Sequence, residues 1–161
     1  QTDSEYRRTV RLNRLRWRNG RMQDHKPLID QEEAVGHAVR AGYTYAAMAD
    51  MARFMDAPEY ERAVDRLWED VVGCKMYVNG GIGTAQYGDE GFGDRYLLPN
   101  RTYCESCAGI AHVLWQQRMT LLKGESKYAD VIELALYNAS ISVIYLSGDS
   151  LFYQNQQQSS V

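Results

Sequence analysis

The sequence predicts an all-α fold in which helical hairpins form part of a larger helical toroid. Apolar residues recur at helical spacing through most of the chain, and breaks at Asp56-Ala57-Pro58 and Gly124 divide the helices into two similar pairs. The 161 residues are 45% hydrophobic and 24% charged, a globular composition for one ordinary domain that excludes disorder. No apolar run approaches the ~20 residues of a membrane-spanning helix, so we expect no membrane partner.

The N-terminal residues 1–22 are rich in arginine and carry a net charge of +5, whereas the whole chain carries −3. Such an end can be a nucleic-acid arm, but no aromatic platform or binding motif accompanies the arginines. Apolar residues lie among them: Val10, Leu12, Leu15 and Trp17. We therefore favour a helix with a solvated basic face and expect no nucleic-acid partner.

The first helical pair is expected over residues 28–74. From about Leu28 to Phe54 there is no proline, and one stripe of small and apolar residues would permit close helix packing. Its members are Val35, Val39, Gly42, Ala46, Ala49 and Phe54. Asp56-Ala57-Pro58 then ends this helix and starts the next, because aspartate is a good N-cap and proline is tolerated in the first turn. The second helix is expected to run to about Cys74 or Tyr77.

The second helical pair is expected over residues 108–146. Its first helix spans about Ala108 to Leu122 and ends at Gly124, and Ser126 can cap a helix from about Lys127 to Leu146. A turn at residues 147–149 and a short strand at residues 151–153 follow.

The two pairs align as repeats at a shift of 68 residues, which places Phe54–Tyr60 on Leu122–Tyr128 and His37 on Glu105. A helical hairpin cannot bury its apolar face alone, so neighbouring hairpins must cover it. Two hairpins form an open arc, and a closed toroid of six would need roughly 400 residues at this spacing. We therefore expect a piece of something longer. Chance similarity between two amphipathic hairpins is the alternative.

The loop at residues 79–106 is glycine-rich, aromatic and acidic. At 28 residues it is long for a connection without secondary structure, and such loops are usually functional or disordered. Its aromatic residues argue against disorder and favour sugar binding, because aromatic faces bind the apolar faces of sugars. A catalytic carboxylic acid needs a raised pKa and hence partial burial. Of Asp89, Glu90 and Asp94, Glu90 is the best placed to be buried, since Gly91 and Phe92 follow it.

The segment Cys104-Glu105-Ser106-Cys107 precedes the second pair. A thioredoxin-like role needs a βαβ context, which is absent, and a structural zinc site needs two cysteine pairs, whereas Cys74 is alone. Glu105 and Cys107 would point the same way in an extended segment, so both could bind one metal if the helix begins near Cys107. A buried free cysteine beside an N-terminal glutamate is the alternative. The odd count of three cysteines favours reduced thiols and, slightly, a cytoplasmic over a periplasmic location.

Several motifs follow one another in a characteristic order between residues 23 and 155. They are Gly36–Ala41, Lys75–Tyr77 with Gly80–Gly83, Leu98–Asn100, Tyr103–Ala108, Tyr128–Glu133 and Leu136–Asn138. In this order they resemble the β-L-arabinofuranosidase family, glycoside hydrolase family 127. The segment Asn100–Glu105 is one residue shorter than we expect for that family.

The resemblance implies an (α/α)6-barrel catalytic domain, of which residues 1–161 would be a part, with β-sandwich domains that this chain does not contain. It implies retaining, exo-acting hydrolysis of terminal β-L-arabinofuranosides on a plant-type oligosaccharide or glycoconjugate, by an enzyme that can be a homodimer. A zinc-bound cysteine thiolate would be the nucleophile. A non-catalytic, carbohydrate-binding module of helical repeats is the alternative.

The resemblance also assigns roles to residues of this chain. Glu90 matches the acid/base, and Glu105 and Cys107 match two zinc ligands. Three further residues match sugar-contacting positions: His37, Glu133 and Tyr153. The family's paired cysteines, the nucleophile and another ligand, would lie beyond the last of these. We therefore expect this chain alone to be inactive and to bind Zn²⁺ weakly.

Overall fold

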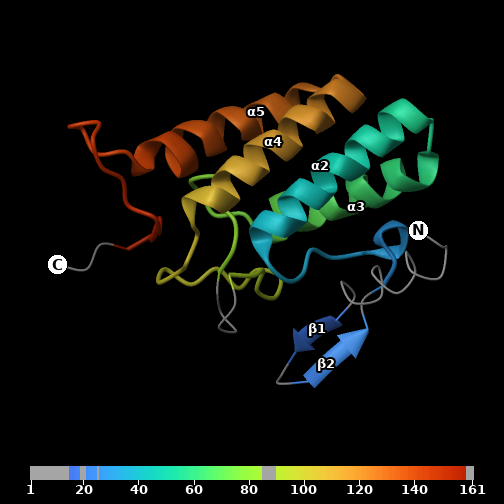
Figure 1. The fold of residues 1–161 in the computed structure, drawn as a ribbon, viewed down its shortest axis with the longest axis horizontal. Coiled ribbons are helices and arrows are strands. Elements are labelled where there is room, and N and C mark those ends of the chain that lie inside the picture. The colour runs from blue at the N-terminus through green and yellow to red at the C-terminus, as the bar shows by residue number, and fades with distance from the viewer. Residues whose placement is uncertain (1–14, 19–20, 25, 85–89, 159–161) are drawn as a thin grey trace, which may run out of the picture.

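The computed structural model describes residues 15–18, 21–24, 26–84 and 90–158. Within these residues, four α-helices form two antiparallel pairs (Figure 1). The helices are α2 (Ala38–Met55), α3 (Pro58–Cys74), α4 (Ser106–Lys123) and α5 (Ser126–Ala135). The first helices of the two pairs, α2 and α4, pack against each other, and α3 and α5 pack on their own partners. The predicted helical hairpins are therefore confirmed.

The repeat predicted from the sequence is reproduced by the helix boundaries, since α4 begins and ends 68 residues after α2. Each of these helices ends in a left-handed residue, Asp56 with φ of 49° and Gly124 with φ of 69°. Gly124 therefore ends its helix as predicted. Asp56, in contrast, caps the end of α2, and Ala57 is the N-cap of α3. Ser126 is likewise the first helical residue of α5 and not its cap.

Two predicted helices have different limits in the structure. The first begins at Ala38 and not near Leu28, because residues 31–37, which follow a short 3-10 turn at Leu28–Asp30, are not helical. Gly36, with φ of 75°, cannot continue a right-handed helix in this conformation. The last helix, α5, gives way to a π-helical turn at Leu136–Ser140 and a 3-10 turn at Ile141–Val143.

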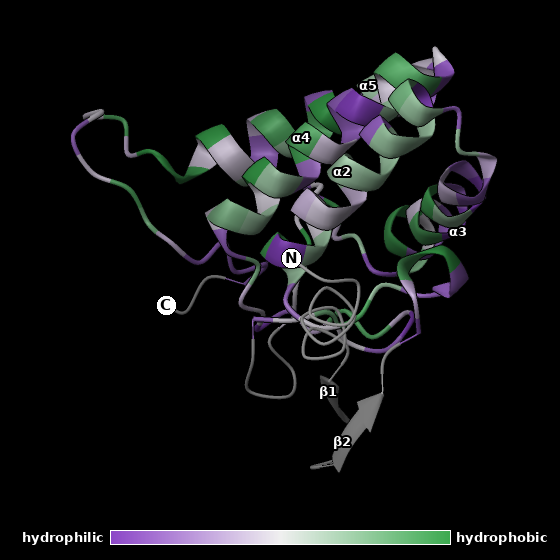
Figure 2. Cartoon of the chain, turned by 45° about the vertical axis from the view of Figure 1, so that its right-hand side comes forward, coloured by the Kyte–Doolittle hydropathy of each residue, from purple (hydrophilic) through white to green (hydrophobic). Residues whose placement is uncertain are grey.

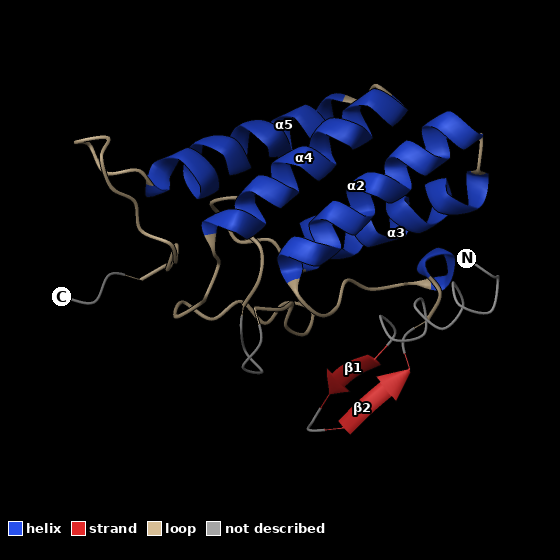
Figure 3. Ribbon diagram, viewed as in Figure 1, coloured by secondary structure: helices blue, strands red, loops and turns tan. Residues whose placement is uncertain are grey.

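The arginine-rich segment contains a β-hairpin where we expected a helix. Strands β1 (Leu15–Arg18) and β2 (Arg21–Asp24) are antiparallel, with Arg18 opposite Arg21, and lie apart from the helices (Figure 3). The two intervening residues in the sequence are Asn19-Gly20, a strong hairpin-turn signal that accounts for the difference. The remainder of this segment lies outside the described residues.

At residues 151–153, where we expected a short strand, the structure has only isolated β-bridges. One isolated bridge pairs Leu151 with Ile144 across the predicted turn, and another pairs Gln154 with Glu105, which precedes α4. Gly148 has φ of 75°, and its N–H donates to the carbonyl of Tyr145, which confirms that turn.

The core lies between the helical pairs and depends on close approach of α2 and α4. A Cβ atom at Gly42 would lie 2.9 Å from the Cβ of Ala111, so the predicted small stripe does permit close packing. Hydrophobic residues recur along α4 and in the segment after α5 (Figure 2), and several of their side chains remain exposed. They include Ile110, Leu114, Leu121, Ile141 and Leu146. Among the described helices, none is long and apolar enough to cross a membrane.

A buried histidine on α4 makes the stability of this core depend on pH. His112 is fully buried, and its Nδ1 lies 3.1 Å from the carbonyl oxygen of Gly80. Burial lowers the pKa of His112 to about 4 from its ordinary value of 6.5. The unfolded chain therefore binds more protons between pH 6.5 and pH 4, so this contribution to stability is complete above pH 6.5 and is lost as the pH falls.

We predict that His112→Asn makes unfolding less sensitive to acid. The free energy of unfolding is measured with urea at pH 7 and at pH 4.5. Its decrease from pH 7 to pH 4.5 should be larger in the unmodified protein than in the variant, by on the order of 2 kcal/mol. Equal losses in the two proteins would contradict this assignment, whatever the variant's stability at pH 7.

Candidate active site

Backbone hydrogen bonds fix the residues in front of α2. The N–H of Ala38 donates to the carbonyl of Glu90, and the N–H of Phe92 donates to the carbonyl of Gly36, both at 2.9 Å. His37 lies between the two bonded positions and pairs with Gly91. The loop that returns from α3 therefore places Glu90 beside His37 at the start of α2.

The same arrangement is repeated in front of α4. The N–H of Ser106 donates to the carbonyl of Tyr153 at 3.0 Å, and the N–H of Asn155 donates to that of Cys104 at 3.1 Å. Glu105 therefore corresponds to His37, as the 68-residue shift predicts, and Tyr153 corresponds to Glu90. Because α2 and α4 lie side by side, the two arrangements meet at one end of the helices (Figure 1).

The side chain of Glu90 is bound at both of its oxygens. Its Oε2 lies 2.7 Å from Nε2 of His37, and its Oε1 accepts a hydrogen bond of 3.0 Å from the hydroxyl of Tyr103. The Glu90 side chain is 42% exposed, so it is held in place yet open to solvent. Burial, followed by the hydrogen bond to Glu90, raises the pKa of Tyr103, and this hydroxyl therefore remains a donor at neutral pH.

Glu105 and Cys107 lie at the start of α4, as predicted. Glu105 is extended, and α4 begins at Ser106, which places Cys107 in the first turn. The thiol of Cys107 donates to the hydroxyl of Tyr153 at 3.3 Å. Hydrogen bonds to Cys107 and then to Glu105 raise the pKa of Tyr153, so one hydroxyl contacts both predicted metal ligands.

The carboxylate of Glu105 is the feature of this site that most needs a further partner. Glu105 is only 3% exposed, and its Oε2 has no hydrogen-bond partner among the described residues. Ligand atoms of His37, Glu90 and Glu105 lie within 4.8 Å of one another. A buried carboxylate oxygen without a partner is costly, and a bound cation is one way to satisfy it.

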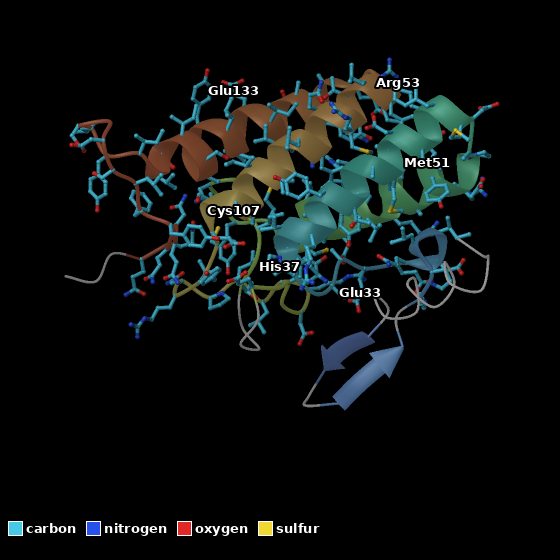
Figure 4. The ribbon with its side chains drawn as sticks, in the orientation of Figure 1. Glu33, His37, Met51, Arg53, Cys107 and Glu133 are labelled. Atoms are coloured by element: carbon cyan, nitrogen blue, oxygen red, sulfur yellow. The ribbon has the colours of Figure 1, made fainter. Side chains whose placement is uncertain are left out.

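Five of the six predicted site residues meet at this end of the helices, and one does not. Glu133 is exposed on α5, away from the end of the helices where His37 and Cys107 lie (Figure 4). The other two cysteines, Cys74 and Cys104, are not among the predicted site residues. Burial raises the pKa of Cys104 to about 12, so its thiol remains protonated, and Cys74 is the last residue of α3. All three cysteines are free, as expected.

An open hollow of about 760 Å³ adjoins Tyr153. Aromatic rings and amide side chains line it: Tyr145, Phe152, Tyr153, Gln154, Asn155, Gln156 and Gln158. Its volume is in the range of ligand sites, and rings with amides suit the apolar faces and hydroxyls of a sugar.

A buried ionic cluster supports the first arrangement, and sequence reasoning missed it. The carboxylate of Asp70, at the end of α3, accepts from the N–H of Ala34 at 2.7 Å and from the Nζ of Lys75 at 3.1 Å, and it pairs with Arg95. Lys75 also donates to the carbonyl of Ala34 at 2.6 Å. Asp70 thus joins the segment before His37 to the loop that follows Glu90.

Tyr103 is a second residue that sequence reasoning left without a role. It belongs to the motif before α4, but its contact with Glu90 joins residues of the two repeats that are 13 positions apart. The sequence showed that Tyr103 is one of the aromatic residues of the loop, but it contained no signal that Tyr103 contacts Glu90.

Comparisons with known proteins agree with this architecture. A family model described as the catalytic domain of β-L-arabinofuranosidase, glycoside hydrolase family 127, matches residues 7–160. A non-reducing end β-L-arabinofuranosidase of Bifidobacterium longum subsp. longum is 40% identical over 134 residues, which are 83% of this chain and 20% of that protein.

Solved structures give the same result. A family 127 β-arabinofuranosidase is 48% identical with a TM-score of 0.79, and a family 127 β-L-arabinofuranosidase from Geobacillus stearothermophilus T6 is 47% identical with a TM-score of 0.79. Each match covers 83% of this chain and 21% of the other. The chain thus spans about a fifth of the length of these relatives.

The class of protein follows from the paired helices and from these neighbours: the hairpins are part of an (α/α)6 barrel. The chain belongs to the β-L-arabinofuranosidase family, glycoside hydrolase family 127.

We predict that Asp70→Ala destabilises the protein by about 3 kcal/mol or more, because it leaves the buried Lys75 ammonium without its closest carboxylate. The matched control is Asp50→Ala, which removes a pair with Arg118 that is more than a third exposed and should cost less than about 1 kcal/mol. Urea unfolding of both variants measures the difference. Similar costs for the two would show that the Asp70 cluster is not a structural centre.

Proposed function

We propose that the protein containing this chain is a retaining, exo-acting glycoside hydrolase that removes terminal β-L-arabinofuranosyl groups. The family match supports the reaction, and the substrate class is that named for the Bifidobacterium and Geobacillus relatives. Residues 1–161 would belong to its (α/α)6-barrel catalytic domain. The observation that carries the proposal is the position of Glu90, held by His37 and Tyr103 and next to the buried carboxylate of Glu105.

Glu90 is proposed as the general acid and base. In the first step its carboxyl proton passes to the glycosidic oxygen as that oxygen leaves the anomeric carbon, and in the second step its carboxylate takes a proton from the attacking water. Partial exposure lets Glu90 reach both the leaving group and the water. His37 and Tyr153 would contact the arabinose near the reacting carbon, and the hollow beside Tyr153 would receive part of the substrate.

Glu105 and Cys107 are proposed as two ligands of a zinc ion. The donor set fits, because the free Oε2 of Glu105 and the thiol of Cys107 both lie near the Tyr153 hydroxyl at the start of α4. Zinc would hold its thiol ligands deprotonated, so that a cysteine outside this chain could act as the nucleophile. Within this chain, Glu105 supplies negative charge and Tyr153 orients the Cys107 side chain.

Glu90→Gln in the full-length protein should lower kcat for arabinofuranosyl oligosaccharides by at least about a hundredfold, because the amide cannot donate the required proton. Its thermal unfolding should match that of the unmodified protein. Glu69→Gln, an exposed change on α3, is the control and should retain activity. Unreduced turnover by Glu90→Gln would rule out the acid/base assignment and favour a binding role for Glu90.

Zinc content provides a test that does not depend on turnover. After dialysis of the full-length protein, Glu105→Gln should retain much less zinc per chain by elemental analysis, with a loss of affinity of at least about tenfold. Glu69→Gln should retain the normal amount. A normal zinc content in Glu105→Gln would exclude Glu105 as a zinc ligand. It would not affect the proposed role of Glu90, which the Glu90→Gln variant tests separately.

A further inference from the structure

Tyr103 lies between the two halves of the site and touches both. Its hydroxyl donates to Oε1 of Glu90 at 3.0 Å, and its ring meets that of Tyr153 edge-on, with centroids 6.1 Å apart and an angle of 75° between the planes. Glu90 belongs to the arrangement before α2, whereas Tyr153 belongs to the one before α4. A single side chain therefore contacts a functional residue of each repeat.

The backbone around Tyr103 is fixed to the same place as the backbone of Glu90. The hydroxyl of Thr102 and the N–H of Cys104 both donate to the carbonyl of Gly83, at 3.1 and 3.0 Å. A Cβ on Gly83 would lie 3.1 Å from the Cβ of Ala38, so this residue packs against the first turn of α2. Ala38 is also the residue whose N–H holds the Glu90 carbonyl. The separation of Tyr103 from Glu90 is therefore set by the backbone.

The Tyr103 hydroxyl restricts a torsion that is otherwise loose. The terminal torsion of a glutamate is broad, so one contact at Oε2 from His37 would leave the carboxyl plane poorly defined. A second contact at Oε1 fixes that plane. We propose that Tyr103 is a positioning residue that orients the Glu90 carboxyl for proton transfer to the leaving oxygen. This inference rests on the proposed function of Glu90 as the acid.

The experiment compares leaving groups in the full-length protein. A sugar leaving group needs a proton from the acid, whereas 4-nitrophenolate leaves readily without one. We expect Tyr103→Phe to lower kcat/KM for an arabinofuranosyl disaccharide by about tenfold and kcat/KM for 4-nitrophenyl β-L-arabinofuranoside by less than about twofold. The ring and its packing on Tyr153 are kept in this variant. The ratio of the two values is also independent of the folded fraction, because both substrates are measured on one sample.

Two further variants complete the design. Glu90→Gln should shift the same ratio in the same direction and by more than Tyr103→Phe does. Tyr60→Phe is the matched control, because Tyr60 lies in the first turn of α3, at the opposite end of the helical pair from His37. It should leave the ratio unchanged.

The outcomes separate this inference from the proposed function. A shifted ratio in Glu90→Gln with an unchanged ratio in Tyr103→Phe would overturn the role of Tyr103 and leave Glu90 as the acid. Unchanged ratios in both variants would overturn both roles. An unmodified protein that hydrolyses neither substrate would overturn the proposed function, and the inference with it.

Discussion

The site depends on one constraint: the segment that leaves the second helix of each pair returns and hydrogen-bonds to the residues just before the first helix. Two N–H groups, those of Ala38 and Phe92, do this in the first repeat, and those of Ser106 and Asn155 do it in the second. Because these bonds join backbone groups, they place whatever side chains the sequence supplies there. The function then depends on which side chains stand at equivalent positions.

The two repeats support this constraint with different chemistry. In the first, the buried carboxylate of Asp70 binds the segment before His37 and the loop after Glu90. The 68-residue shift places Asn138 at the position of Asp70, and there the main-chain carbonyl accepts from the side-chain amide of Asn155 at 3.0 Å. Asn138 lies in the π-helical turn, where the ordinary helical bonding pattern is interrupted. The Asp70 carboxylate in the first repeat and the main-chain carbonyl of Asn138, in the π-helical turn of the second, thus bind equivalent returning segments.

Local signals in the sequence predicted the helices and marked five residues that the structure brings together at the candidate site. Helical spacing, Pro58 and Gly124 are short-range features, and the 68-residue repeat alone places His37 and Glu105 at equivalent positions. The Asp70 cluster and the Tyr103–Glu90 contact are not encoded in this way, because they join residues whose separation has no fixed period. The start of α2 was misplaced for a related reason: residues 31–37 are held in a non-helical conformation by contacts with α3 and the loop, and these contacts override helical propensity.

The two carboxylates of the site differ in environment in a way that supports different roles. Glu90 is partly exposed, and both of its oxygens already have partners that can themselves move or orient a proton, an imidazole and a phenol. Glu105 is almost completely buried, and one of its oxygens has no hydrogen-bond partner within the part of the chain that the structure describes. A bound cation would stabilise an ionised carboxylate in such a place, whereas an open carboxyl between two hydrogen-bonding groups is suited to exchange protons with substrate and water. The contrast arises from their places in the repeat. Glu105 lies directly before α4, at the position equivalent to His37, whereas Glu90 lies on the returning segment, at the position equivalent to Tyr153. Exchanging these two placements would bury the Glu90 carboxyl and expose the Glu105 carboxylate, so the order of residues along the repeat matters as much as their identity.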